Sequence, residues 1–454
     1  MRLKHLATPL GLLAFMLLAG SPAPAAAQGQ TPQVNPRPAP SEGKVKAIRA
    51  GRLLDVKAGK YLTNQIILIT GDKITDVGPT LQIPAGAEVI DLSKATVLPG
   101  MADKHLHLSG ANARHFLPTL NNGKGDPAFG PADQFLLKHQ EALKSLQAGV
   151  TTIAEMGGGW ESIDVKRAID NGLVAGPRML TAGANFAVVK GDTPETVRAK
   201  VREHRKRGAD WIKLHVDAGS CNSPRITLTR DGKMTTTRAP DYTVDIVKAV
   251  VDEAHKLGMK VADHVYGGEA LDWDIEAGVD SLEHVVFATP EQLANIKAKG
   301  IVVGTTLFDM SKDHEEDMKK FGNSCWAMVQ KGFTNNYKSG NKLVLSSGSQ
   351  SDPQFSHGLQ GHMLEYYVKL GTTPIDAIRI ATINTHEILG VNAGSIEKGK
   401  YADIIAVSGD PLKEIKEMRR VKFVMKGGDL VRGAGTGGFS PELTPARVYP
   451  PIVR

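Results

Sequence analysis

Eight apolar, strand-like runs alternate with amphipathic, helix-like segments through the middle of the 454-residue chain, and this alternation constrains the fold most strongly. The helix-like segments include Ala132–Gln147, Pro194–Arg207, Val244–Leu257 and Pro290–Lys299. Such alternation indicates parallel βα units, and eight units over roughly 290 residues are typical of a (β/α)8 TIM barrel, which carries its chemistry at the carboxyl ends of the strands. The strand-like runs are Val97–His107, Val150–Glu155, Arg178–Ala182, Trp211–Val216, Lys260–His264, Ser281–Val286, Ile301–Thr306 and Lys342–Ser347.

Both flanks of this region have a different texture, with short strand-like runs separated by turns. We therefore expect an α/β protein in which residues 45–96 and 391–430 form one small β-sandwich domain beside a catalytic barrel at 97–390. Residues 28–44, rich in Pro and Gln, are expected to form a flexible leader, and residues 431–454 a flexible tail.

The first 27 residues have the pattern of a secretory signal peptide. Basic Arg2 and Lys4 precede an apolar stretch at Leu6–Ala19, and Ala25–Ala27 supplies an Ala-x-Ala cleavage site. A membrane anchor would need roughly 20 apolar residues, so we expect cleavage near Ala27, export to the periplasm or outside the cell, and no membrane association afterwards.

The charge pattern argues against a nucleic-acid-binding protein, and the cysteine content argues against a small disulfide-rich one. Cleavage removes two positive charges from a formal net charge of +7, and the only basic cluster is Arg202, Arg205, Lys206 and Arg207. Solvated helix faces explain this pattern, so we expect no nucleic-acid partner. Two cysteines, Cys221 and Cys325, are too few for a disulfide framework, and whether they pair stays open.

Histidines occur at the ends of several predicted strands. His105 and His107 stand two apart, so their imidazoles share one face, while His264 and His284 close later strands. A His-x-His pair alone is often an ordinary polar pair, but convergence on one barrel mouth favours a divalent metal such as zinc. Bound zinc can supply hydroxide at neutral pH.

Lys213 lies in the fourth predicted strand, among these histidines. An ammonium has three donors and no acceptor, so the lysine can bind metal only after carbon dioxide has converted it to a carboxylate. The alternative is an ion pair with an acid such as Asp217, and the spacing does not decide between the two.

Two motifs resemble those of the amidohydrolase superfamily: the opening motif at residues 97–107 (VLPGMADKHLH) and the closing motif at 394–403 (GSIEKGKYAD). The resemblance covers residues 45–430 and is nearest to the prolidase-like and imidazolonepropionase-related branch. It implies a hydrolase with two divalent ions, most often Zn²⁺, that cleaves amide bonds of dipeptides or N-acyl amino acids. It also implies a homo-oligomer. By this resemblance His105 and His107 would hold one ion, His264 and His284 the other, and carboxylated Lys213 would bridge them with hydroxide.

The end of the eighth strand departs from the family pattern. Where the resemblance implies a Gly-Thr/Ser-Asp whose Asp is the general base, this chain has Gly348, Ser349 and Gln350. A glutamine amide is not a base. Asp352 follows two positions later, which preserves the facing of an extended chain, so we expect Asp352 to be the catalytic base. An altered site without that group is the alternative.

Two long loops, Leu108–Pro131 and Asp217–Asp241, follow predicted strands one and four, and long loops in compact domains are usually functional. The candidate substrate-binding residues are His215, Arg225 and Tyr242, in or beside the second loop, and His357. For each residue in or beside the second loop, a solvated loop residue is at least as good an explanation.

The sequence therefore predicts an exported, metal-dependent amidohydrolase of dipeptidase type. Metal-activated hydroxide attacks esters and lactones in the same way, so a lactonase or esterase is one alternative. A binding protein that kept the scaffold and lost the strand-eight acid is another, and Gln350 is the residue that favours it.

Overall fold

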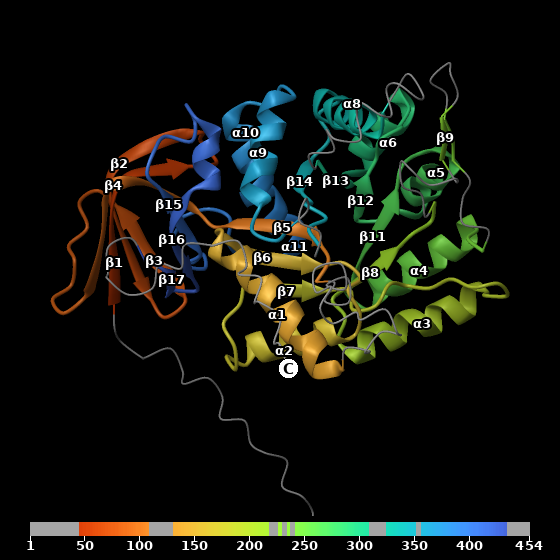
Figure 1. Cartoon of the computed structure of the whole chain (residues 1–454), viewed down its shortest axis with the longest axis horizontal. Helices are drawn as coiled ribbons and strands as arrows, with labels where there is room; N and C mark the ends of the chain where they lie inside the picture. Colours follow the sequence, from red (N-terminus) through yellow and green to blue (C-terminus); the bar gives the residue numbers. More distant parts are fainter. Residues whose placement is uncertain are drawn as a thin grey trace, which may run out of the picture. The chain divides into compact units, whose positions relative to one another are not determined.

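The computed structural model describes residues 45–108, 130–217, 226–228, 234–236, 241–307, 324–350 and 356–433. It shows an α/β protein (Figure 1). No helix within these ranges is long and apolar enough to cross a membrane. The expected signal peptide and leader, Asp352, Arg225, Cys221 and the chain after Gly433 lie outside the described residues.

One seven-stranded sheet combines both ends of the chain, in the order β17-β16-β15-β4-β1-β2-β3 (Figure 1). β1 pairs with β4 in parallel, and the other neighbours are antiparallel. In β2 the buried side chains Gln65, Ile67 and Ile69 alternate with less buried ones, as expected of a strand with one face on a core. The strands are β1 (Val45–Asp55), β2 (Lys60–Thr70), β3 (Lys73–Gly78), β4 (Glu88–Pro99), β15 (Ile404–Val407), β16 (Val421–Lys426) and β17 (Asp429–Arg432).

Two strands run past the domain boundaries that the sequence suggests. β4 continues beyond residue 96 to Pro99, and β17 continues beyond residue 430 to Arg432. β4 continues because its last residues pair with β15 in register, Leu98 opposite Ile405 and Pro99 opposite Ile404. This pairing carries the chain from the seven-stranded sheet directly into the next strand, β5.

Eight further strands overlap the eight apolar runs and form two parallel sheets. Backbone hydrogen bonds join these sheets at both edges, from Asp210 N to Thr181 O at 2.8 Å and from His107 N to Ser349 O at 2.8 Å. The strands are β5 (Met101–Leu106), β6 (Val150–Glu155) and β7 (Arg178–Thr181) in one sheet, and β8 (Trp211–Leu214), β11 (Lys260–Val265), β12 (Ser281–His284), β13 (Val302–Thr305) and β14 (Leu343–Leu345) in the other. A short hairpin of β9 (Ile226–Leu228) and β10 (Met234–Thr236) stands apart from them.

Helices connect the parallel strands, and their boundaries follow capping residues in the sequence. Thr193, Thr243, Thr289 and Ser324 each accept a hydrogen bond from a backbone N–H three residues later, which satisfies a donor at the helix start. The helices are α1 (Pro131–Gln147), α2 (Glu161–Asp170), α3 (Pro194–Arg207), α4 (Val244–Lys256), α5 (Gly268–Ala277), α6 (Pro290–Lys299), α8 (Cys325–Lys338), α9 (Gln360–Lys369), α10 (Pro374–Arg379) and α11 (Thr385–Leu389), with a π-helical segment at Ile380–Asn384 and a 3-10 segment at Ile415–Arg419.

β11 and α5 bring two buried carboxyl groups together, those of Asp263 and Asp274. Among the described residues, no other group donates a hydrogen bond to either oxygen of Asp274 or to Oδ2 of Asp263. Burial, and then the charge of Asp263, hold the pKa of Asp274 well above its usual range. One proton shared by the two carboxyls accounts for this arrangement.

We expect Asp274→Asn to raise the melting temperature by about 2 °C at pH 8 and to change it little at pH 5. A carboxyl whose pKa is raised by folding stabilises the fold at acidic pH, and that stability is lost as the pH rises through the folded pKa. Asparagine replaces the protonated acid at every pH. Thermal unfolding at both pH values tests this, with exposed Asp164→Asn as the control; an equal shift at both pH values would contradict it.

Candidate active site

His105 and His107 meet at the end of β5. Their Nε2 atoms are 3.1 Å apart and their rings are nearly perpendicular. With zinc–nitrogen bonds of about 2.0–2.1 Å and tetrahedral angles, two histidine ligands of one ion have nitrogens about 3.3 Å apart. The facing Nε2 atoms therefore fit a shared divalent ion.

His264 and His284 form a second pair, on the neighbouring strands β11 and β12. Nδ1 of His264 and Nε2 of His284 are 3.0 Å apart, and the rings lie edge to face. His284 and Val285 both have positive φ, 79° and 44°, a left-handed conformation that is unusual for any residue other than glycine and for Val above all. Such backbone strain is typical of functional sites.

Lys213 lies in β8 and is only 1% exposed. Its Nζ has no hydrogen-bond partner among the described residues, and Asp217, the expected alternative partner, accepts a hydrogen bond from Tyr266 N instead. Burial lowers the pKa of Lys213 to about 8. An unpaired buried ammonium is costly, and an amine with a lowered pKa is more often neutral and can react with carbon dioxide.

The chemistry of this donor set fits two divalent ions. Burial lowers the pKa of His105 to about 4 and holds those of His107 and His284 well below their usual range, so these imidazoles are neutral and have lone pairs for a metal. No group of three or more His, Cys, Asp or Glu side chains that could hold one ion occurs within the described ranges; the histidines meet in pairs. Carboxylation of Lys213 would add the ligand that each pair needs.

The four expected substrate residues have different surroundings. His215 stacks on His264, with ring centroids 5.3 Å apart, whereas Tyr242 is buried in the core and donates to Phe186 O at 3.4 Å. His357 is buried and donates from Nε2 to His107 O at 3.2 Å, so it supports the backbone of a candidate ligand. Arg225 lies outside the described residues.

Two residues at the site were not predicted from the sequence. The first is Glu283, which accepts a hydrogen bond from His105 Nδ1 at 3.1 Å. The second is Tyr266, which stacks on His284 with ring centroids 5.0 Å apart. A sequence signal existed for each: Glu283 directly precedes a candidate ligand, and Tyr266, the residue just after β11, follows His264 by two positions, which places both on the same face if the chain continues extended.

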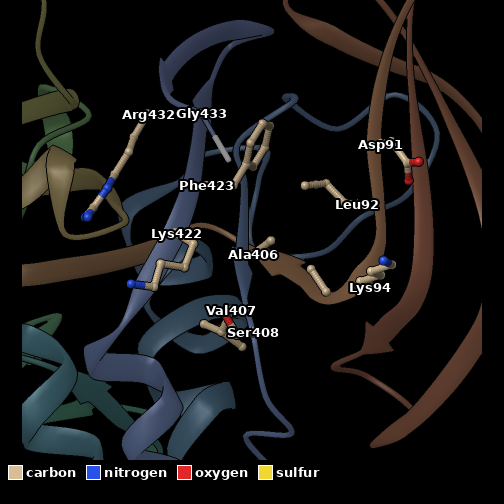
Figure 2. Close-up of a pocket in the computed structure, with 11 residues that line it drawn as sticks. Asp91, Leu92, Lys94, Ala406, Val407, Ser408, Lys422, Phe423, Arg432 and Gly433 are labelled. Carbon is tan, nitrogen blue, oxygen red and sulfur yellow. The ribbon is translucent and has the colours of Figure 1, made fainter. Parts of the chain in front are cut away.

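A cavity of about 360 Å³ lies elsewhere, on the seven-stranded sheet (Figure 2). Strand residues such as Leu92, Ala406 and Phe423 line it, together with the charged side chains of Asp91 and Lys422. None of the candidate ligands borders this cavity, so it is not part of the histidine site.

Comparison with known proteins identifies the family. The family model described as amidohydrolase family matches residues 96–431. Ochratoxinase from Aspergillus niger is 26% identical over 454 residues, covering 88% of this chain and 89% of that protein. A crystal structure of a Xaa-Pro dipeptidase with bound methionine is 28% identical, with a TM-score of 0.71 over 86% of this chain and 100% of that one. The crystal structure of A. niger ochratoxinase, 24% identical with a TM-score of 0.71 over 87% of this chain and 97% of that one, has a similar fold. The chain therefore belongs to the amidohydrolase family and is a hydrolase that acts on carbon–nitrogen bonds.

Proposed function

We propose that this protein is an exported, zinc-dependent amidohydrolase that cleaves the amide bond of a dipeptide or an N-acyl amino acid. One observation carries the proposal: two pairs of histidines, and a buried lysine whose Nζ has no hydrogen-bond partner among the described residues, lie at the ends of parallel strands. The relatives support the bond type, since one similar structure is a Xaa-Pro dipeptidase and ochratoxinase is similar over most of the chain. Export rests on the signal-peptide pattern that ends at Ala27.

We also propose that the eight parallel strands close into a (β/α)8 barrel and that the seven-stranded sheet from both ends of the chain folds over on itself as a β-sandwich beside it. Two backbone hydrogen bonds support closure: one from Asp210, just before β8, to Thr181 of β7, and one from His107, just after β5, to Ser349 in the segment after β14. The TM-scores of 0.71 to amidohydrolase relatives support the same architecture.

In the proposed mechanism, each residue has a definite task. His105 and His107 would hold one ion, and His264 and His284 would hold the other. Carboxylated Lys213 would be a ligand of both ions. These ions, when bound, would polarise the scissile carbonyl and supply hydroxide at neutral pH. Asp352 accepts the proton released as the carbonyl is attacked and donates it to the leaving nitrogen. His215 and Arg225 are proposed to bind the carboxylate of the substrate.

Metal removal tests this proposal. We expect the purified mature protein to contain about two ions per chain and to hydrolyse dipeptides or N-acyl amino acids, and a chelator to lower activity at least about 100-fold. Elemental analysis measures the metal content, and a hydrolysis screen on the same sample measures the activity. Zinc with bicarbonate should restore activity.

A pair of histidine variants provides the control. His264→Asn should lower the metal content, whereas His255→Asn, on the exposed surface of α4, should not. No bound metal and no turnover in the wild type, even with added zinc and bicarbonate, would reject the enzyme and favour the binding protein. Cleavage of esters or lactones but of no amide would favour the lactonase or esterase alternative.

A further inference from the structure

A buried ion pair lies directly beneath the first histidine pair. Lys104, next to His105 in β5, forms a salt bridge with Glu283 of β12, and both side chains are 0% exposed. Glu283 also accepts a hydrogen bond from Ser281 Oγ at 2.9 Å and one from His105 Nδ1 at 3.1 Å. Both carboxylate oxygens of Glu283 therefore have partners, and one partner is a candidate metal ligand.

An irregularity in β5 makes this arrangement possible. Neighbouring residues of a regular strand point to opposite faces, yet Lys104 and His105 both contact Glu283. The register between β5 and β6 shifts between Asp103 and Leu106, which places one extra residue in β5. Bulges of this kind redirect side chains and are common beside active sites.

The neighbouring strand β13 leaves space for the carboxylate. A Cβ atom on Gly304 would lie 2.3 Å from Glu283 Oε2 and 2.1 Å from Ser346 Oγ, so no other residue fits at this position without a shift. The ammonium of Lys104 also lies 5.2 Å from the centre of the Trp211 ring, a favourable cation–π contact. The position of Glu283 is thus fixed on several sides.

Stability alone does not explain this ion pair. Removing two charges from water costs several kcal/mol per ion, and apolar residues of similar volume often serve the fold equally well. The carboxylate supplies something that an apolar residue cannot. It has no proton, so Nδ1 of His105 must carry the hydrogen, and the lone pair is then on Nε2, the atom that faces His107 Nε2.

We propose that the Lys104–Glu283 pair is a positioning device that holds His105 in the tautomer and orientation needed to bind a divalent ion. This inference rests on the metal site proposed above. Glu283 acts through His105, and Lys104 supplies the counter-charge that keeps the carboxylate in place.

Two double variants test it without leaving an unpaired buried charge. Lys104→Met/Glu283→Leu removes both charges and the acceptor, while Lys104→Met/Glu283→Gln removes the charges and keeps an amide oxygen for Nδ1–H. The control is Glu155→Gln, at a buried glutamate that accepts hydrogen bonds from Thr181 Oγ1 at 2.7 Å and from Gly158 N, neither of which belongs to a candidate ligand. Cobalt(II) titration of each metal-free protein measures affinity, and the visible absorption of bound cobalt reports ligand geometry.

We expect the leucine variant to lose on the order of 10- to 100-fold in affinity for one ion, with a changed cobalt spectrum. The glutamine variant should lie between it and the wild type, and Glu155→Gln should match the wild type. Melting temperatures of the metal-free proteins check folding, and the glutamine variant gives the same test if the leucine variant does not fold. Wild-type affinity and spectrum in both double variants would reject the positioning role and leave the metal site intact. A wild-type protein that binds no cobalt would instead reject the proposed function.

Discussion

Lys213→Met is expected to lower kcat/KM by at least about 1,000-fold and, at the same time, to raise the melting temperature of the metal-free protein. Loss of the bridging ligand removes several kcal/mol of transition-state stabilisation, and about 4 kcal/mol corresponds to 1,000-fold in rate. Stability should rise because Nζ is buried without a hydrogen-bond partner among the described residues, and methionine fills similar space without a charge. Opposite changes in activity and stability indicate a residue retained for function.

Lys213→Glu separates the two interpretations of this lysine. If Lys213 acts as a carboxylate, glutamate supplies a shorter carboxylate at the same place and should keep part of the metal binding that Lys213→Met loses. If it acts as an ammonium that pairs with an acid, glutamate should be the more damaging change. Metal content and kcat/KM distinguish these results, and native mass spectrometry should show the mass of one added carbon dioxide on the wild type only.

The positions of the candidate ligands could be predicted because local patterns determine them. Apolar runs locate the strands, and a polar residue near the end of such a run lies near the carboxyl end of a parallel strand, as Lys213 and His264 do. Which atoms of these candidate ligands face one another and form hydrogen bonds could not be predicted from the sequence. They depend on the irregular register of β5 and on the left-handed turn at His284 and Val285, which result from tertiary packing.

In the seven-stranded sheet, too, the existence of the strands could be predicted from the sequence but their arrangement could not. Short strands separated by turns at both ends of the chain predict one β domain, and one sheet does contain β1–β4 and β15–β17. Its order could not be predicted, because β4 lies between β1 and β15, and the latter pairing joins residues about 300 positions apart in sequence. The Lys104–Glu283 pair is equally non-local, so neither residue alone revealed it.

The end of the eighth strand leaves one chemical question, which residue serves as the base. The backbone of this segment is fixed beside a candidate ligand, since Ser349 O accepts a hydrogen bond from His107 N at 2.8 Å. Gln350 follows directly, and its amide can donate and accept hydrogen bonds but cannot take up a proton at neutral pH. Asp352 is the next acid in the sequence.

Asp352→Asn is therefore expected to lower kcat by about 100- to 10,000-fold while metal content stays at the wild-type level, because general base catalysis contributes about that much. The matched control, Gln350→Ala, should change kcat by less than about 10-fold. Gln350→Asp completes the set, since it places a carboxylate at the position that the family pattern expects. If Asp352 is the base, this added acid should change the rate little. Nearly full activity in Asp352→Asn, together with a faster Gln350→Asp enzyme, would instead show that the native site works without its own base.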